Sequence, residues 1–351
     1  MSHTVFEASY STSGTSPGIP ARGASRPRTL LVGLGQVGRA ALQDAASAGL
    51  DIVAVADTSG VLYSAAGVDA ARVAAHKAAG RALSDLGAER LPLELALGLI
   101  QPALVLIATD SDPRRAAAAR AFARTALAEG ARVAFAAKHA FAEPDAVLGA
   151  AVAGGSLGCD AALGGTGRAL ASDLARLRAE CVEVELVANA TSTLVLDALA
   201  RGATLASALE AARAQGLLEG DPSADLDGTD AALKLAAVAA LVFERTLELG
   251  APRRPDLRAL DARSIAPRTR LVARASRGGC AELELRELAP GDPLAARPGS
   301  VVYAYRLRDG RRSVHVGRAL GAAKTARALL ADGARLCAAA GARGLESGGA
   351  R

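Results

Sequence analysis

The chain has 351 residues, of which 51% are hydrophobic and 3% aromatic, so it has material for about two globular domains with cores of Ala, Leu and Val. Its formal net charge is +5, and its basic residues are spread along the chain without interleaved aromatics, which argues against nucleic-acid binding. No uncharged apolar run approaches the ~20 residues of a membrane span. We therefore expect a soluble, cytoplasmic protein with no membrane or nucleic-acid partner.

The cysteines and the termini give further expectations. The four cysteines lie far apart without a CxxC pair, which predicts buried free thiols in a reducing compartment: Cys159, Cys181, Cys280 and Cys337. Residues 1–27 are rich in Ser, Thr, Gly and Pro and contain one acid, Glu7. We expect a disordered tail there, with an organellar transit peptide as the alternative. Residues 342–351 are also expected to be a disordered tail.

A glycine-rich turn follows the first predicted strand, Thr29 to Val32. It reads Gly33-Leu34-Gly35-Gln36-Val37-Gly38, and a helical pattern continues to about Ala48. In such a turn the first glycine permits the tight bend, the second lets the backbone approach a pyrophosphate, and the third lets helix and strand pack closely. The helix N-terminus then faces the phosphates. The pattern predicts a dinucleotide-binding turn whose cofactor contacts are Gly33, Gly35, Gln36, Val37 and Gly38.

The next predicted strand, Asp51 to Ala56, ends at Asp57, nineteen residues after Gly38. That is close to the ~20 residues expected before a carboxylate that accepts from a ribose 2′-hydroxyl. An acid at this point repels a 2′-phosphate, so the spacing favours NAD over NADP. The alternative is that Asp57 only caps a loop.

Two more predicted strands, 103–108 and 132–137, are separated by a helical stretch, which predicts a parallel sheet with helices on both faces. Thr109 and Lys138 fall at the carboxyl ends of these strands, where ligands bind in such sheets. Further along, alternation at 182–186 and 281–285 and a strand pair at 301–308 and 313–316 predict an antiparallel sheet.

The predicted fold class is therefore α/β, with a Rossmann-type nucleotide-binding domain and a second α+β catalytic and dimerisation domain whose sheet is mostly antiparallel. The first domain is expected at 28–154, completed by 317–341, and the second at 155–316.

The most informative stretch is 215–238, which places Glu219, Asp225, Asp230 and Lys234 within twenty residues. Asp230 and Lys234 share one face if the run from Thr229 is helical. Burial lowers the pKa of an amine and a nearby carboxylate raises it, so a balanced amine can exchange a proton near neutral pH. Only four of the 41 basic residues are lysine, so a lysine within this acidic cluster favours a functional role for Lys234. The alternative is a surface salt bridge between Asp230 and Lys234.

The order E-x-D-P-x-x-D-x-x-G-x-D-A-A-x-K-L, from Glu219 to Leu235, resembles the catalytic segment of homoserine dehydrogenases. Four further segments resemble parts of the same family: the D-S-S-G loop at 57–60, the T-P-T-N loop at 109–112, the N-G-T-T-N loop at 189–193 and the returning helix at 317–336. Lys138 matches the lysine of the family's T-A-N-K motif, but Phe135 and Ala137 stand in place of its Thr and Asn. The resemblance covers residues 29–336.

The resemblance implies interconversion of L-homoserine and L-aspartate 4-semialdehyde with NAD or NADP, with Lys234 and Lys138 facing each other as acid–base groups. Two ammonium groups in one cleft depress each other's pKa. Glu219, Asp225, Asp230 and Thr191 would then bind the substrate, although the acids alone indicate only a substrate that carries an amine. The family also implies a homodimer paired through the second domain's sheet.

Asp160 to Thr166 correspond to the family's E-A-x-V-G-G segment, which implies a possible main-chain Na⁺ site near Asp160, Leu163 and Gly165; a simple hinge is the alternative. Two other functions stay open. The first is a related reductase that acts on another small carbonyl compound. Three departures from the family pattern favour it: the altered T-A-N-K motif, Arg168 in place of a proline and Tyr303 in place of an Asn. The second is a non-catalytic dinucleotide-binding protein. The retained lysines and acids disfavour it, because buried charges without a function cost stability.

Overall fold

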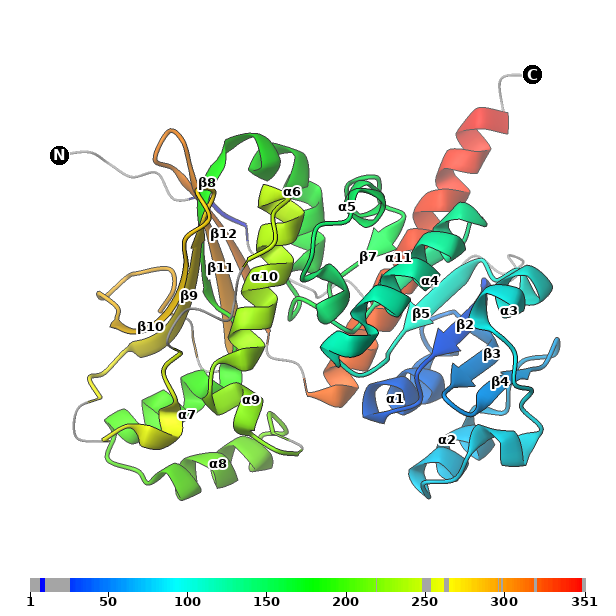
Figure 1. Ribbon diagram of the computed structural model, residues 1–351, viewed down its shortest axis with the longest axis horizontal. Helices are drawn as coiled ribbons and strands as arrows, with labels where there is room; N and C mark the ends of the chain where they lie inside the picture. The colour runs from blue at the N-terminus through cyan, green and yellow to red at the C-terminus, as the bar shows by residue number, and fades with distance from the viewer. Residues whose placement is uncertain are drawn as a thin grey trace. The chain divides into compact units, whose positions relative to one another are not determined.

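The computed structural model describes residues 7–9, 26–218, 220–247, 254–261, 265–295, 297, 299–318 and 321–348 (Figure 1). They fall into two compact units. The parallel-sheet unit lies within 13–140, 146–162 and 322–351, and the antiparallel-sheet unit within 1–12, 141–145 and 163–321. Each unit contains a six-stranded sheet, so the predicted α/β fold class is confirmed.

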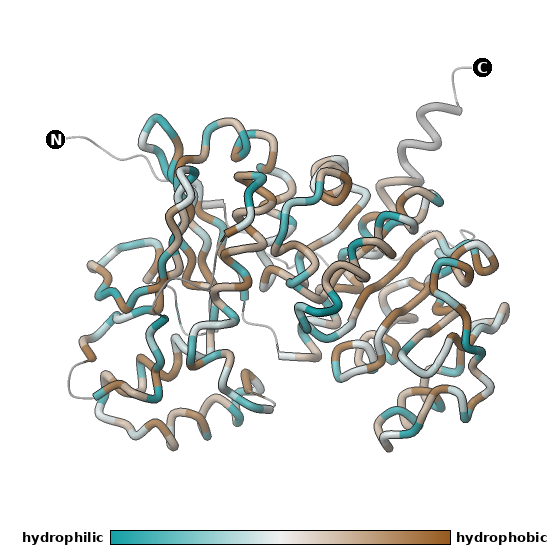
Figure 2. Tube along the Cα trace, in the orientation of Figure 1, coloured by the Kyte–Doolittle hydropathy of each residue, from teal (hydrophilic) through white to brown (hydrophobic). Residues whose placement is uncertain are grey.

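The parallel-sheet unit has the strand order β4-β3-β2-β5-β6-β7. Its strands are β2 (Arg28–Val32), β3 (Asp51–Asp57), β4 (Gly60–Tyr63), β5 (Leu104–Ile107), β6 (Arg132–Phe135) and β7 (Leu157–Gly158). All neighbours are parallel except β4, which turns back antiparallel to β3. The central strands are apolar and almost fully buried, as expected where helices cover both faces, and they run brown in Figure 2.

The helices of this unit are α1 (Gln36–Asp44), α2 (Ala70–Ala78), α3 (Leu93–Ile100), α4 (Ala116–Ala128), α5 (Ala146–Ala153) and α11 (Ala322–Gly348), with short 3₁₀ turns η1 (Leu83–Leu86), η2 (Pro113–Arg115) and η3 (His139–Phe141) along the same part of the chain. Leu42 of α1 and Leu329 of α11 belong to one buried cluster with Leu104 of β5. At Gly333 of α11 an added Cβ would lie 2.7 Å from a Leu104 methyl, so the glycine lets this helix approach the sheet. The C-terminal helix thus completes the cover of the parallel sheet.

The antiparallel-sheet unit has the strand order β1-β12-β11-β8-β9-β10. Its strands are β1 (Glu7–Ser9), β8 (Cys181–Val187), β9 (Thr269–Ser276), β10 (Ala281–Glu287), β11 (Ser300–Leu307) and β12 (Arg312–Arg318). Its helices are α6 (Gly167–Glu180), α7 (Ala190–Ala200), α8 (Leu205–Ala214), α9 (Ser223–Leu226) and α10 (Thr229–Phe243), with a 3₁₀ turn η4 (Leu257–Ala259). Helices α6 and α10 pack on one face of the sheet (Figure 1).

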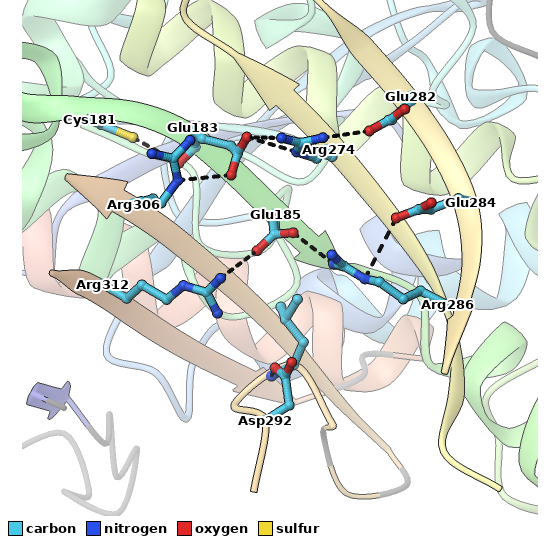
Figure 3. Close-up of polar contacts among 11 residues, drawn as sticks. Cys181, Glu183, Glu185, Arg274, Glu282, Glu284, Arg286, Asp292, Arg306 and Arg312 are labelled. Carbon is cyan, nitrogen blue, oxygen red and sulfur yellow. Dashed lines mark hydrogen bonds and ion pairs between the residues drawn. The ribbon is translucent and has the colours of Figure 1, made fainter. Parts of the chain in front are cut away.

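The opposite face of this sheet carries a charged network (Figure 3). Glu183 and Glu185 of β8 point to this face, and both carboxylates are buried beneath arginines from the flanking strands. Their partners are Arg274 and Arg306 for Glu183, and Arg286 and Arg312 for Glu185. The alternation of the strands therefore separates an apolar helix-facing side from a charge-balanced outer side.

Both predicted tails contain described elements. Within the predicted tail 1–27, the backbone of Glu7–Ser9 pairs in parallel with β12; Met1–Phe6 and Tyr10–Ser25 lie outside the described residues. Within the predicted tail 342–351, helix α11 continues to Gly348. Burial holds for Cys159 and Cys181, but Cys280 is exposed in the turn between β9 and β10. Within the described residues no helix is long and apolar enough to cross a membrane.

Candidate active site

The glycine turn after β2 has the geometry that a dinucleotide needs. Gly33 has φ +96°, and a Cβ there would lie 2.6 Å from the backbone of Ala108 at the end of β5. A Cβ on Gly38 would lie 1.9 Å from the carbonyl oxygen of Gly33, so α1 packs directly on the turn. At Gly35, by contrast, an added Cβ would meet nothing within 4 Å. Two glycines are thus required by the fold, and the third leaves open space beside the backbone.

Helix α1 begins at this open space. Its N-cap is Gly35, which makes no side-chain cap, so the N–H groups of the first turn are available to an anion. Gln36 is exposed and Val37 packs partly against the core cluster, which fixes the start of the helix. The turn therefore fits a pyrophosphate, with Gln36 and Val37 contributing backbone rather than charge.

The carboxylate of Asp57, at the end of β3, is bonded to residues beside it. Its Oδ1 accepts from the Ser59 N–H at 2.8 Å and from the Ser59 hydroxyl at 2.6 Å, and its Oδ2 pairs with Lys77 Nζ at 2.7 Å. Burial raises the pKa of the Asp57 carboxyl, but the bonds from Lys77 and Ser59 outweigh burial and hold that pKa below its usual value. The carboxylate is ionised, and a lysine offsets its charge.

Thr109 and Lys138 lie where the sequence placed them, after adjacent parallel strands. A Cβ on Gly33 would lie 2.7 Å from the Thr109 backbone nitrogen, so the structure brings Thr109 next to the glycine turn. Lys138 follows β6 and is half-buried. Because β2, β5 and β6 are neighbouring parallel strands, their carboxyl ends form one edge of the sheet.

The lysine–carboxylate cluster lies in the antiparallel-sheet unit. Lys234 and Asp230 project from one face of α10, and Lys234 Nζ donates to Asp230 Oδ2 at 2.8 Å and to the carbonyl oxygen of Ala188 at 2.7 Å. The two side chains are only 12% and 11% exposed. An ammonium has three N–H donors, and these two bonds aim the group and leave the third for a ligand. The surface salt bridge considered from the sequence is thus not what the structure shows.

Asn189 joins this cluster, and it was missing from the predicted site residues. Its Nδ2 donates to Asp225 Oδ1 at 2.6 Å and to Asp230 Oδ2 at 2.9 Å. Its Oδ1 accepts the backbone N–H of Ser192 at 2.8 Å and so caps α7. The signal in the sequence was the resemblance of segment 189–193, which begins with Asn189, to the family's N-G-T-T-N loop.

The remaining substrate-site predictions fare differently. Thr191 is buried, and its hydroxyl donates to the carbonyl oxygen of Leu217 at 3.2 Å, which ties α7 to the segment before α9. Glu219 lies outside the described residues. Asp225, on α9, is half-buried and contacts Asn189 as described.

At the predicted sodium positions the structure shows two hydrogen bonds that involve the backbone, and a glycine turn. The Asp160 N–H donates to Asp332 Oδ2 at 2.8 Å, and the Leu163 carbonyl accepts from the Thr166 hydroxyl at 2.8 Å. Gly165 has φ +83°, a turn conformation that favours glycine. In the described part of the chain no group of three or more His, Cys, Asp or Glu is arranged to hold a metal. The main-chain site stays a prediction.

The fold and these residues define a class: a two-domain protein with a Rossmann-type unit and an antiparallel-sheet unit that holds a buried lysine among carboxylates. Comparison with known families identifies its parts. Residues 170–333 match the homoserine dehydrogenase family, and residues 21–143 match the Glutamate/Leucine/Phenylalanine/Valine dehydrogenase family. The resemblance predicted from the sequence is therefore confirmed over residues 170–333.

Individual relatives agree. Homoserine dehydrogenase of Pyrococcus horikoshii is 34% identical over 113 residues, 32% of this chain and 33% of that protein. The Neisseria gonorrhoeae enzyme is 30% identical over 157 residues, 42% of this chain and 36% of that protein. The chain therefore aligns with only about a third of the length of these curated relatives.

Solved structures share the fold. A hyperthermophilic archaeal homoserine dehydrogenase in complex with NADPH superposes with a TM-score of 0.66 at 23% identity, covering 87% of this chain and 96% of that one. Homoserine dehydrogenase from Thermoplasma acidophilum gives a TM-score of 0.64 at 20% identity, covering 87% and 97%.

Proposed function

We propose that this protein is an NAD(P)-dependent oxidoreductase that interconverts L-homoserine and L-aspartate 4-semialdehyde. The observation that carries the proposal is the Lys234 amine, which is largely buried and aimed by Asp230 and by the Ala188 carbonyl. The family match over 170–333 includes every residue of this cluster. A side chain held this way suits general acid–base catalysis, which requires a proton-transfer group in a fixed position.

In the proposed oxidation, neutral Lys234 takes the proton of the substrate hydroxyl and becomes an ammonium. A nicotinamide dinucleotide, which Gly33, Gly35 and Gly38 would hold, would accept the hydride from the carbinol carbon. In the reverse direction the ammonium returns the proton to the new alkoxide oxygen. A bound nicotinamide supplies the hydride chemistry, and the residues supply position and proton transfer.

The acids of the cluster support a substrate that carries an ammonium group. Asp225 and Asp230 both accept from the Asn189 amide, and Asp230 also pairs with Lys234. Carboxylates grouped in this way suit the binding of a cationic amine. We retain Glu219 and Thr191 as substrate-side residues of the proposal, together with Lys138 as a second candidate for the acid–base step.

The cofactor is proposed to be NAD or NADP. NADPH is the ligand in the archaeal neighbour's structure. In this chain Asp57 favours a ribose 2′-hydroxyl, but Lys77 at 2.7 Å offsets the repulsion that a 2′-phosphate would otherwise meet. Titration of the protein with NADH and NADPH, followed by cofactor fluorescence, measures the preference.

The glycine turn gives a matched pair of variants for cofactor binding. Gly35→Ala places a methyl group in the open space, so it should weaken dinucleotide binding with little change in unfolding temperature. Gly38→Ala should instead lower stability by about 1–3 kcal/mol, because its Cβ collides with the Gly33 carbonyl. Equal effects of both changes on binding and stability would contradict a nucleotide at Gly35.

The function is tested by incubating the protein with L-homoserine and NAD or NADP and following the absorbance of the reduced cofactor. A second candidate, reduction of another small carbonyl compound, is favoured by Phe135 and Ala137, which cannot supply the polar side chains of the Thr and Asn in the family's motif. A panel of aldehydes and ketones with NADH and NADPH separates the two. Turnover of a panel compound without turnover of homoserine would overturn the first proposal.

Two partner proposals complete the function. We propose a homodimer formed through the outer face of the antiparallel sheet, supported by the balanced charges of that face, such as Glu185 between Arg286 and Arg312 (Figure 3). Light scattering at low and high salt tests the dimer, because exposed charge contacts weaken with ionic strength. Assays in sodium and in tetramethylammonium buffers test the proposed Na⁺ site.

A further inference from the structure

The side-chain amide of Asn189 donates to both Asp225 and Asp230. We infer that Asn189 is a positioning residue, whose amide holds the two carboxylates together and thereby fixes the Asp230 oxygen that aims the Lys234 amine. The inference rests on the proposed function, since it assigns a part in the same site.

The geometry fixes the orientation of the amide. Because Oδ1 accepts the Ser192 N–H at 2.8 Å, the amide nitrogen must face away from α7. The nitrogen carries two hydrogens, and two carboxylate oxygens lie at 2.6 and 2.9 Å from it. Both ends of the side chain are therefore engaged.

The bridge links three separate elements. Asn189 precedes α7, Asp225 lies on α9 and Asp230 on α10, so the amide joins segments 36 and 41 residues away along the chain. Asp230 Oδ2 receives both the Asn189 amide and the Lys234 ammonium, so this oxygen is held from two sides. Two carboxylates brought together without a donor would repel each other. The amide relieves this repulsion without adding a charge.

This arrangement explains why an amide is needed and a carboxylate is not equivalent. Asn189→Asp keeps the shape and the acceptor that caps α7, but it removes both donors and adds a third negative charge. Asn189→Ser also keeps a good helix cap and removes the bridge without adding charge. Thr204→Ala is the matched control, because Thr204 is an exposed residue that caps a different helix of the same unit, α8, through the Ser207 N–H at 3.2 Å.

The first readout is turnover. Both Asn189 variants should lower kcat for homoserine oxidation by about tenfold to a hundredfold, the cost of misplacing a reacting group, while the dissociation constant of the cofactor is unchanged. The pH at which oxidation reaches half its maximum should move upward, more in Asn189→Asp than in Asn189→Ser. Thr204→Ala should lose stability without any change in the pH profile. A pH profile unaltered in both Asn189 variants would reduce Asn189 to a helix cap.

The second readout does not depend on activity. The chain has four lysines, so competitive labelling with acetic anhydride across pH, read by peptide mass spectrometry, follows each amine separately. Labelling of Lys234 should require a higher pH in Asn189→Asp than in the wild type, with Lys77 and Lys324 unchanged. If homoserine is not turned over but this shift appears, the proposed reaction fails and the positioning role stands. If Lys234 labels identically in all variants, the positioning role fails.

Discussion

Two of the chain's four lysines lie in buried pairs with aspartates, one in each unit, and the pairs differ in what surrounds them. In the parallel-sheet unit Lys77 meets Asp57 at 2.7 Å, and in the antiparallel-sheet unit Lys234 meets Asp230 at 2.8 Å. The exposures of the side chains are also alike, between 11% and 17%. Distance and burial alone would assign both pairs the same role.

Their other partners separate them. Asp57 completes its bonds with Ser59, two residues away, so its carboxylate is occupied within one turn of chain. Asp230 and Lys234 take their further bonds from Asn189 and the Ala188 carbonyl, 41 and 46 residues away. The first pair joins β3 to α2, and its carboxylate is completed by the neighbouring Ser59. The second pair lies within one helix, but its further bonds come from distant residues, as expected of a group that must point in one direction during proton transfer.

The largest effect should come from breaking the second pair. Lys234→Ala removes the proposed acid–base group, so turnover should fall by about 10²–10⁴-fold, while cofactor affinity stays nearly constant. Lys234→Arg keeps the positive charge but cannot release a proton near neutral pH, so it should be equally inactive and well folded. Steady-state kinetics and cofactor titration measure both. Normal turnover in either variant would assign the proton transfer elsewhere.

Breaking the first pair should change selectivity instead of turnover. Lys77→Ala leaves the Asp57 carboxylate unpaired, so NADPH binding should weaken relative to NADH binding by about tenfold, which corresponds to 1.4 kcal/mol. Asp57→Asn should move the preference in the opposite direction. Lys324→Ala removes an exposed lysine of α11 and serves as the control. Parallel losses for both cofactors would show that Lys77 acts on the fold and not on the 2′ position.

The same contrast explains what the sequence could predict. The glycine turn, Asp57 and the Asp230–Lys234 pair are local spacings, and the structure places each of them as those spacings indicate. Asn189 is different, because its contacts arise only when α7, α9 and α10 come together. The hairpin strand β4 was also missed, since four residues after a longer strand carry too little periodicity. Residue spacings within one segment could thus be predicted from the sequence, and the contacts between distant elements could not.

A third buried carboxylate sharpens the comparison, because it has no lysine. Asp332 of α11 is 3% exposed, accepts the Asp160 N–H and pairs with Arg335 at 3.1 Å. Burial, followed by the nearby Asp160 charge, raises the pKa of the Asp332 carboxyl to about 6. For Asp57, by contrast, lysine and serine donors overcome burial and the pKa is lowered. Burial dominates at Asp332 despite the Arg335 pair, whereas the lysine and serine donors dominate at the less deeply buried Asp57.

The consequence for stability has a definite sign. The pKa of Asp332 is higher in the folded chain than the ordinary value of 3.8, so its protonated form favours folding. This contribution is full below pH 3.8 and is lost as the pH rises through about 6. A shift of about two pKa units corresponds to about 3 kcal/mol, an upper limit for the strain that ionised Asp332 imposes at pH 7.5.

Asp332→Asn keeps the oxygen that accepts the Asp160 N–H and removes the charge, so the variant should gain unfolding temperature at pH 7.5 relative to pH 5. Thermal melts of wild type and variant at both values isolate this contribution from other titrating groups. Asp160→Asn should give a smaller change of the same sign, because it lowers the pKa of Asp332 without abolishing its ionisation. If the difference between wild type and Asp332→Asn were the same at both pH values, Asp332 would already be ionised at pH 5, and burial without a lysine would not be enough to hold a proton there.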